Sequence, residues 1–233
     1  MSKSQKLNNK TSSFPIACIL FFIGVVFFVI SAFLDSYAII DVLGVPKGGN
    51  LGSSLLISMP LFLLAFSSTN TSKKPSILFL IVLFIQTGLS SLGIIGSIIT
   101  CVTNFQHNFV YGIANCISAI AIILLTIGYL CVFVFSLIIK ILKKTSKLCK
   151  FWFLFPSVLV LGYITAIAGK IATLILSVKD MFGYPEFIAI SIVAAIFLAL
   201  AYIIFIIAFF AVCYQFAKIN KNLSLPEDSE ITE

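Results

Sequence analysis

The sequence contains no arginine, one histidine and one tryptophan, so it offers few groups for polar chemistry. Only 10% of its 233 residues are charged, against about 25% in soluble domains. Hydrophobic residues make up 61% of the chain. A soluble core of this size cannot bury so much apolar surface, whereas a lipid bilayer can. These proportions exclude an ordinary soluble domain and predict an integral membrane protein.

Motifs that carry enzymatic chemistry are also missing. The sequence has no C-x-x-C pair, no G-x-S-x-G, no H-E-x-x-H and no glycine-rich phosphate loop. The single histidine, His107, stands outside the long apolar runs. The sequence therefore predicts no catalytic residues, no metal and no cofactor, and it favours a protein that is not an enzyme.

Long apolar runs are what the sequence does contain. A spanning helix needs about 20 mainly apolar residues, and six segments qualify. We expect an all-α membrane domain over residues 14–213, between a short N-terminal segment (1–13) and a largely disordered acidic tail (214–233). The expected spans are Phe14–Leu34, Leu51–Ser67, Ser76–Thr100, Gly112–Ile139, Trp152–Ser177 and Phe187–Cys213. The second is short and contains Pro60.

The lysines predict the orientation of these spans. Twelve lysines fall in the N-terminal segment, the second and fourth connections and the C-terminal tail. The opposite side has two, Lys47 and Lys179. Because lysine-rich connections stay in the cytosol, we expect both termini to be cytosolic.

Lys170 is the one lysine inside a predicted span, about 10 Å from its outer end. A charge at this depth is a hypothesis of function by default. Its side chain can reach the outer headgroups, or it can pair with a carboxylate. Asp35 is the best candidate partner because it ends the first span on the same side. The two residues form a predicted charge site within the membrane or at the headgroups.

Two cysteines flank the connection between the third and fourth predicted spans. Cys101 and Cys116 can form a disulfide if this connection faces an oxidising lumen. The other four cysteines lie mostly in apolar runs, where a thiol acts as a small hydrophobe.

Five lysines between Lys140 and Lys150 form a cytosolic basic connection. Such a cluster can simply determine the topology, or it can bind anionic lipid headgroups. Membrane lipids are thus the expected partners. Nucleic acid is not, despite the net charge of +7.

Several short motifs resemble the DRAM family, the damage-regulated autophagy modulators, within the Frag/DRAM/Sfk group. Asn104-Phe105-Gln106 stands between the third and fourth spans, where that family has N-F-Q. The stretch with Asp41, Gly44 and Pro46 resembles the family's D-x-G and prolines between spans one and two. Phe151-Trp152 and Gln215-Phe216 also match in position. The sequence departs from the family at Lys47 and Gly48, where an adjacent proline and a Glu are usual, and it lacks a Glu in the sixth span.

The resemblance implies a six-span protein of lysosomal, vacuolar, Golgi or plasma membranes that acts in autophagy or lipid homeostasis. It implies a loop of Asp41, Gly44, Pro46, Asn104, Phe105 and Gln106 on the lumenal face. Two alternatives stay open. One is a factor that remodels GPI-anchor lipids, with Asp35, His107 and Lys170 near a headgroup. The other is a small transporter, or its membrane subunit, with a polar path lined by Gln86, Thr87, Ser90 and Ser91.

Overall fold

The computed structural model describes residues 14–43, 58–65, 75–107, 109–141, 146–180 and 185–223. The described chain is helical apart from short turns. Its elements in chain order are α2 (Phe14–Leu43), a short helix at residues 58–65, α4 (Ile77–His107), α5 (Phe109–Ile141), α6 (Ser146–Lys150), α7 (Leu154–Asp180) and α8 (Pro185–Leu223).

Five of the described helices, α2, α4, α5, α7 and α8, are long and apolar enough to cross a membrane. The chain is therefore an integral, multi-pass membrane protein. In hydrocarbon every backbone polar group must be satisfied within the protein, and a helix does this internally. The second predicted span, Leu51–Ser67, lies largely outside the described residues, which include only the helix at 58–65.

Prolines mark the starts of the helices. Pro15, Pro156 and Pro185 each lie in the first turn of α2, α7 and α8, where a missing N–H costs nothing because it has no partner inside the helix. Pro75 precedes α4, and Ser76 caps that helix by accepting a hydrogen bond from the Phe79 N–H at 3.0 Å. The sequence thus sets where the helices begin more firmly than where they end.

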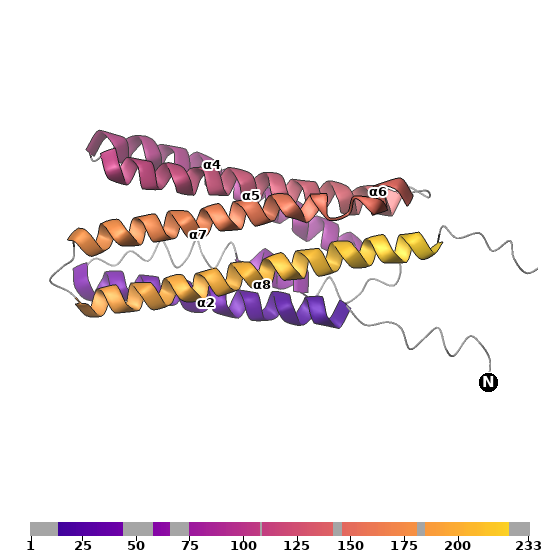
Figure 1. Ribbon diagram of the computed structural model, residues 1–233, viewed down its shortest axis with the longest axis horizontal. Helices are drawn as coiled ribbons and strands as arrows, with labels where there is room; N and C mark the ends of the chain where they lie inside the picture. The colour runs from indigo at the N-terminus through magenta and orange to yellow at the C-terminus, as the bar shows by residue number, and fades with distance from the viewer. Residues whose placement is uncertain are drawn as a thin grey trace, which may run out of the picture.

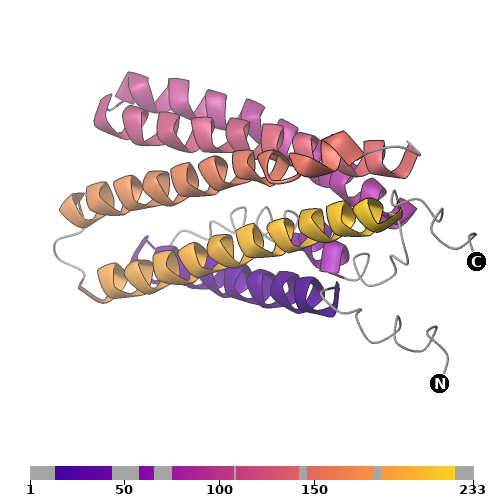
Figure 2. The ribbon, with the colours of Figure 1, turned by 45° about the vertical axis from the view of Figure 1, so that its right-hand side comes forward.

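The helices form an antiparallel bundle in the order α4, α5, α7, α8, α2 (Figures 1 and 2). Each packs mainly against its neighbours in this order. The aromatic contacts show the antiparallel direction, since Phe21 meets Phe209 while Phe28 meets Tyr202. The indigo start of α2 and the yellow end of α8 lie at one end of the bundle (Figure 1). We call this the terminal end, and the other end the distal end.

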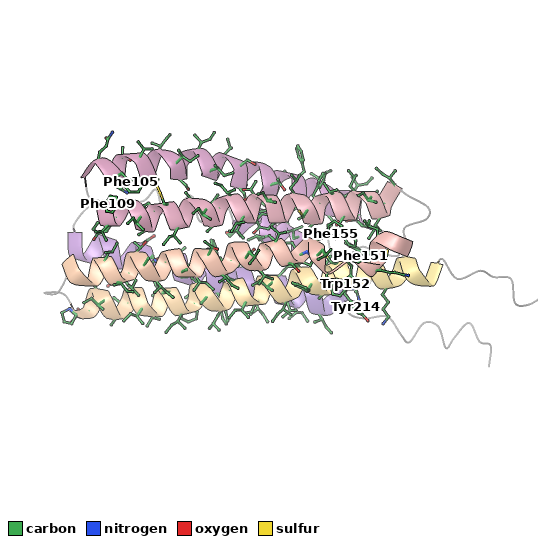
Figure 3. All side chains as sticks on the ribbon, turned by 45° about the horizontal axis from the view of Figure 1, so that its top comes forward. Phe105, Phe109, Phe151, Trp152, Phe155 and Tyr214 are labelled. Atoms are coloured by element: carbon green, nitrogen blue, oxygen red, sulfur yellow. A yellow bond between two sulfur atoms is a disulfide. The ribbon has the colours of Figure 1, made fainter. Side chains whose placement is uncertain are left out.

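The buried core lies in the middle and the terminal half of the bundle. It contains large rings such as Phe135, Phe205 and Phe209, all fully buried. Trp152 and Tyr214 lie at the terminal end, whereas Phe105 and Phe109 lie at the distal end (Figure 3). The distal half buries mostly small side chains, for example Ala114, Ala119 and Ala194. Large rings therefore fill the terminal half of the bundle, and small side chains fill the distal half.

Close approach of α5 and α7 depends on glycine. A Cβ added at Gly162 would lie 2.9 Å from the backbone nitrogen of Leu125, and one at Gly128 would lie 2.9 Å from that of Leu159. Small residues let helices in lipid approach closely enough for van der Waals packing to hold them together.

Gly162→Ala is therefore expected to lower the stability of the folded protein by about 1–3 kcal/mol, the usual cost of overpacking. Gly96→Ala is the matched control, because a Cβ there meets no atom within 4 Å. Thermal unfolding in detergent measures both. Equal melting temperatures for the two variants would contradict the close packing of α5 against α7.

Candidate functional site

The bundle consists of two helical bodies whose main contact is the seam between α7 and α8. The α4–α5–α7 body and the α2–α8 body are each closely packed, and the contacts between α7 and α8 are fewer than those within either body. Aromatic rings close the middle and terminal half of this seam. Tyr163 lies against Tyr202 with ring centroids 4.8 Å apart, and Trp152 lies against Phe210 at 5.9 Å. The distal half of the seam contains an ion pair and an apolar groove instead.

An ion pair connects the two bodies in the distal half. Lys170 Nζ of α7 lies 2.5 Å from Asp35 Oδ2 of α2. The two side chains are 27% and 29% exposed. Of the two arrangements open from the sequence, the structure shows the pair with Asp35 and not a side chain that extends to the headgroups. Lys170 is ten residues from Asp180, the end of α7, or about 15 Å along the helix axis.

A groove of about 260 Å³ lies beside this ion pair, between α7 and α8. Its whole surface is apolar, including the part that Lys170 contributes. The hydrocarbon stem of Lys170 therefore forms part of the wall while its ammonium group turns to Asp35. The groove is lined by Ile167, Lys170, Ile171, Leu174, Ile192, Ala195, Ile196, Leu198 and Ala199.

A layer of buried polar groups crosses the bundle nearer the terminal end. The Tyr129 and Tyr163 hydroxyls share a hydrogen bond of 2.7 Å between α5 and α7, and Gln86 of α4 is a hydrogen-bonding neighbour of Tyr129. Within the part of the chain that the structure describes, Gln86 Oε1 has no hydrogen-bond partner. Sequence reasoning missed this layer, because isolated tyrosines in apolar runs give no signal of which ones face each other.

A second polar contact holds α2 to α8. Ser31 Oγ donates a buried hydrogen bond to the Ala194 carbonyl at 2.7 Å. Interhelical hydrogen bonds of this kind contribute modestly to helix association in lipid. The contact lies one turn from Asp35 on α2, so it helps to fix the register of the helix that carries the carboxylate.

The predicted family loop is only partly described. Gly44 and Pro46 lie outside the described residues, and of Asp41 only the helical backbone is described. Asn104, Phe105 and Gln106 belong to the last turns of α4, so the prediction that they form a loop is wrong. The apolar run ends near Thr100, but no proline or glycine stops the helix before His107. Phe105 packs over Gly112, where an added Cβ would meet its ring at 2.5 Å.

The structure joins Cys101 of α4 and Cys116 of α5 in a disulfide near the distal end (Figure 3). The sulfur atoms thus link two helices and not the ends of a loop as the sequence predicted, since both helices continue past the bond. The predicted boundary at residue 214 also falls inside a helix, because α8 continues to Leu223.

Of the residues named for the lipid-remodelling alternative, Asp35 and Lys170 form the ion pair, whereas the residues named for a transporter path differ in their surroundings. Gln86 is buried, but Thr87 and Ser91 donate to carbonyls of their own helix, and Ser91 is exposed. The His107 side chain lies outside what the structure describes. Within the described ranges no group of His, Cys, Asp or Glu residues could hold a metal ion.

The basic connection is described only in part. Lys140 Nζ donates to the Pro75 carbonyl at 3.2 Å, and Lys150 is exposed at the end of α6. Nearby, Lys218 lies 5.8 Å from the centre of the Tyr214 ring, and Tyr214 also contacts Trp152. Lysine, tyrosine and tryptophan are typical of the level of the lipid headgroups. The terminal end therefore has the composition of a membrane–water interface.

The fold and these contacts define a multi-pass membrane protein that has an apolar groove between α7 and α8 and, beside it, an ion pair between α7 and α2. No protein-family model, no curated protein and no solved structure matches the chain. The resemblance to the DRAM family thus stays a prediction.

Neutralising one member of the ion pair is expected to destabilise the bundle. Asp35→Asn and Lys170→Met should each lower the melting temperature, and the double variant should lose less than the two losses added. The expected coupling is about 0.6 kcal/mol, the average for polar contacts between helices in lipid, and at most about 1.7 kcal/mol. A double-mutant cycle of unfolding free energies measures this coupling. Strictly additive losses would show that the two side chains do not interact.

Proposed function

We propose that this protein is a non-enzymatic membrane protein that holds a lipid acyl chain in the groove between α7 and α8. The observation that carries the proposal is the apolar groove in the distal half of the seam. Its larger role is then DRAM-like, in autophagy or membrane lipid homeostasis. The following points support it.

The surroundings of the groove favour an acyl chain as its occupant. Ile171, Ile192 and Ile196 line the groove and are also exposed, so it opens sideways toward whatever surrounds the bundle. Since α7 and α8 are membrane-spanning helices, that medium is hydrocarbon. A neighbouring lipid chain can enter without exposing either surface to water. The groove offers such a chain no polar group that would need a partner.

We further propose six crossings with both ends in the cytosol. The helices α2 and α4 run in the same direction, from the terminal to the distal end (Figures 1 and 2). Because α2 ends at the distal end and α4 begins at the terminal end, this shared direction supports the predicted second span around the helix at 58–65. The excess of lysines supports a cytosolic terminal end. The Cys101–Cys116 disulfide near the distal end fits an oxidising lumen there.

In sealed vesicles with the cytosolic face outward, protease should remove an epitope placed after Leu223 without detergent. A membrane-impermeant phosphine should reduce the Cys101–Cys116 bond only after detergent opens the vesicles. Alkylation of the freed thiols and mass spectrometry report the reduction. If the phosphine reduces the bond in sealed vesicles while the epitope is protected, the orientation is inverted.

The groove is tested with a phospholipid that carries a photoreactive group on its acyl chain. After irradiation in nanodiscs, labelled peptides should map to residues 167–174 and 192–199. Ala195→Trp fills the groove and is expected to remove most of this labelling. Ala189→Trp is the matched control, because Ala189 is exposed on α8 and is not part of the groove lining.

Both tryptophan variants should fold equally well, which their melting temperatures check. Equal labelling of residues 192–199 in the two variants would show that the chain does not occupy the groove. Labelling spread evenly over all lipid-facing helices would lead to the same conclusion.

The compartment and the lipids at the terminal end complete the proposal. The resemblance to the DRAM family implies an endomembrane, and a lysosomal or vacuolar membrane before the others. Anionic headgroups are proposed at the basic connection Lys140–Lys150, supported by the exposed Lys150 and the adjacent Trp152. A solute flux in liposomes would instead favour the transporter alternative, although Gln86 is buried while Ser91 is exposed.

A further inference from the structure

The ion pair has unused capacity for hydrogen bonds. An ammonium group carries three donors, and Lys170 gives one of them to Asp35 Oδ2. Among the residues that the structure describes, Asp35 Oδ1 accepts no hydrogen bond and Lys170 makes no second one. Both side chains keep more than a quarter of their surface exposed, at 29% and 27%. In a membrane protein, the environment must therefore supply partners to both members of the pair.

The pair is also adjacent to the proposed acyl-chain groove. Lys170 belongs to both, since its stem lines the groove and its ammonium group meets Asp35. Ile167, Leu198 and Ala199 continue the groove from Lys170 toward the middle of the bundle. A lipid whose headgroup lies at the ion pair can place its acyl chain against these residues. One molecule can then contact the groove and the pair together.

The charges of the pair select the headgroup. Lys170 offers donors to an anion and Asp35 offers an acceptor to a cation, and the two together carry no net charge. A headgroup that combines a phosphate diester with a primary ammonium group matches both. A headgroup with phosphate alone leaves Asp35 Oδ1 without a donor. A trimethylammonium headgroup has the right charges but no N–H to donate.

We propose that the Asp35–Lys170 pair and the α7–α8 groove form one binding site for a zwitterionic phospholipid with a primary amine, of the phosphatidylethanolamine type. Its phosphate accepts hydrogen bonds from Lys170, its ammonium group donates to Asp35, and one acyl chain occupies the groove. The inference rests on the proposed function, because it assigns the headgroup of the lipid whose chain the groove holds.

The experiment uses the full-length protein in nanodiscs with three photoreactive phospholipids that share one acyl chain. Their headgroups are ethanolamine, choline and glycerol, each present at the same mole fraction. Labelling of residues 167–174 and 192–199 should be highest for ethanolamine. The expected excess over choline is about threefold or more, the size of one hydrogen bond in lipid.

Two variants test whether the charges of Asp35 and Lys170 select the headgroup. Asp35→Asn leaves an unpaired Lys170, so labelling should shift from the ethanolamine to the glycerol lipid, which is anionic. Lys170→Gln removes the partner of the phosphate, so the preference for ethanolamine over choline should fall without a gain for glycerol. Ser157 is half-buried on α7 near the terminal end, where its hydroxyl donates to the Phe153 carbonyl of the preceding turn. It provides a control variant, Ser157→Ala, that should keep the wild-type order.

The outcomes separate the headgroup assignment from the groove itself. Equal groove labelling by ethanolamine and choline lipids in the wild-type protein would overturn the headgroup assignment and leave the groove intact. Absence of groove labelling with all three lipids would overturn the proposed function as well. The melting profile of Asp35→Asn verifies its fold. If the three lipids label this variant in the same order as the wild-type protein, Asp35 does not contribute to headgroup selection.

Discussion

The absence of water inside the bilayer is the constraint on which the structure depends. It makes every crossing a helix, and it removes the hydrophobic effect as a force between helices. What remains is close packing and a few polar contacts. The chain uses both, with Gly128 and Gly162 between α5 and α7 and the Asp35–Lys170 pair between the two bodies.

These forces are distributed unevenly along the bundle. Large rings, including Phe205 and Phe209, fill the middle and the terminal half. The distal half of the α7–α8 seam has the ion pair and a groove instead. One end is therefore filled by aromatic rings, and the other has a groove that is open at its side. A lipid chain can thus enter the groove while the aromatic core keeps the helices in register.

Much of the fold could be predicted from the sequence because apolar runs and prolines are local signals. The starts of α2, α4, α7 and α8 fall within a few residues of the predicted spans. The ends of the helices were harder to predict, because no residue near Gln106 or Cys213 stops a helix. The partner of Lys170 could be named because few carboxylates exist on that side. The Tyr129–Tyr163 contact and the groove could not, because both depend on how the helices are rotated against each other.

The central claim is that Asp35 and Lys170 join the two helical bodies across the distal seam. Exchanging the charges tests it most directly, through the melting temperatures of Asp35→Lys, Lys170→Asp and the double exchange. The account predicts that each single change places two like charges together and destabilises the protein, while the double exchange recovers most of the loss. A double variant that is no more stable than the worse single variant would contradict it.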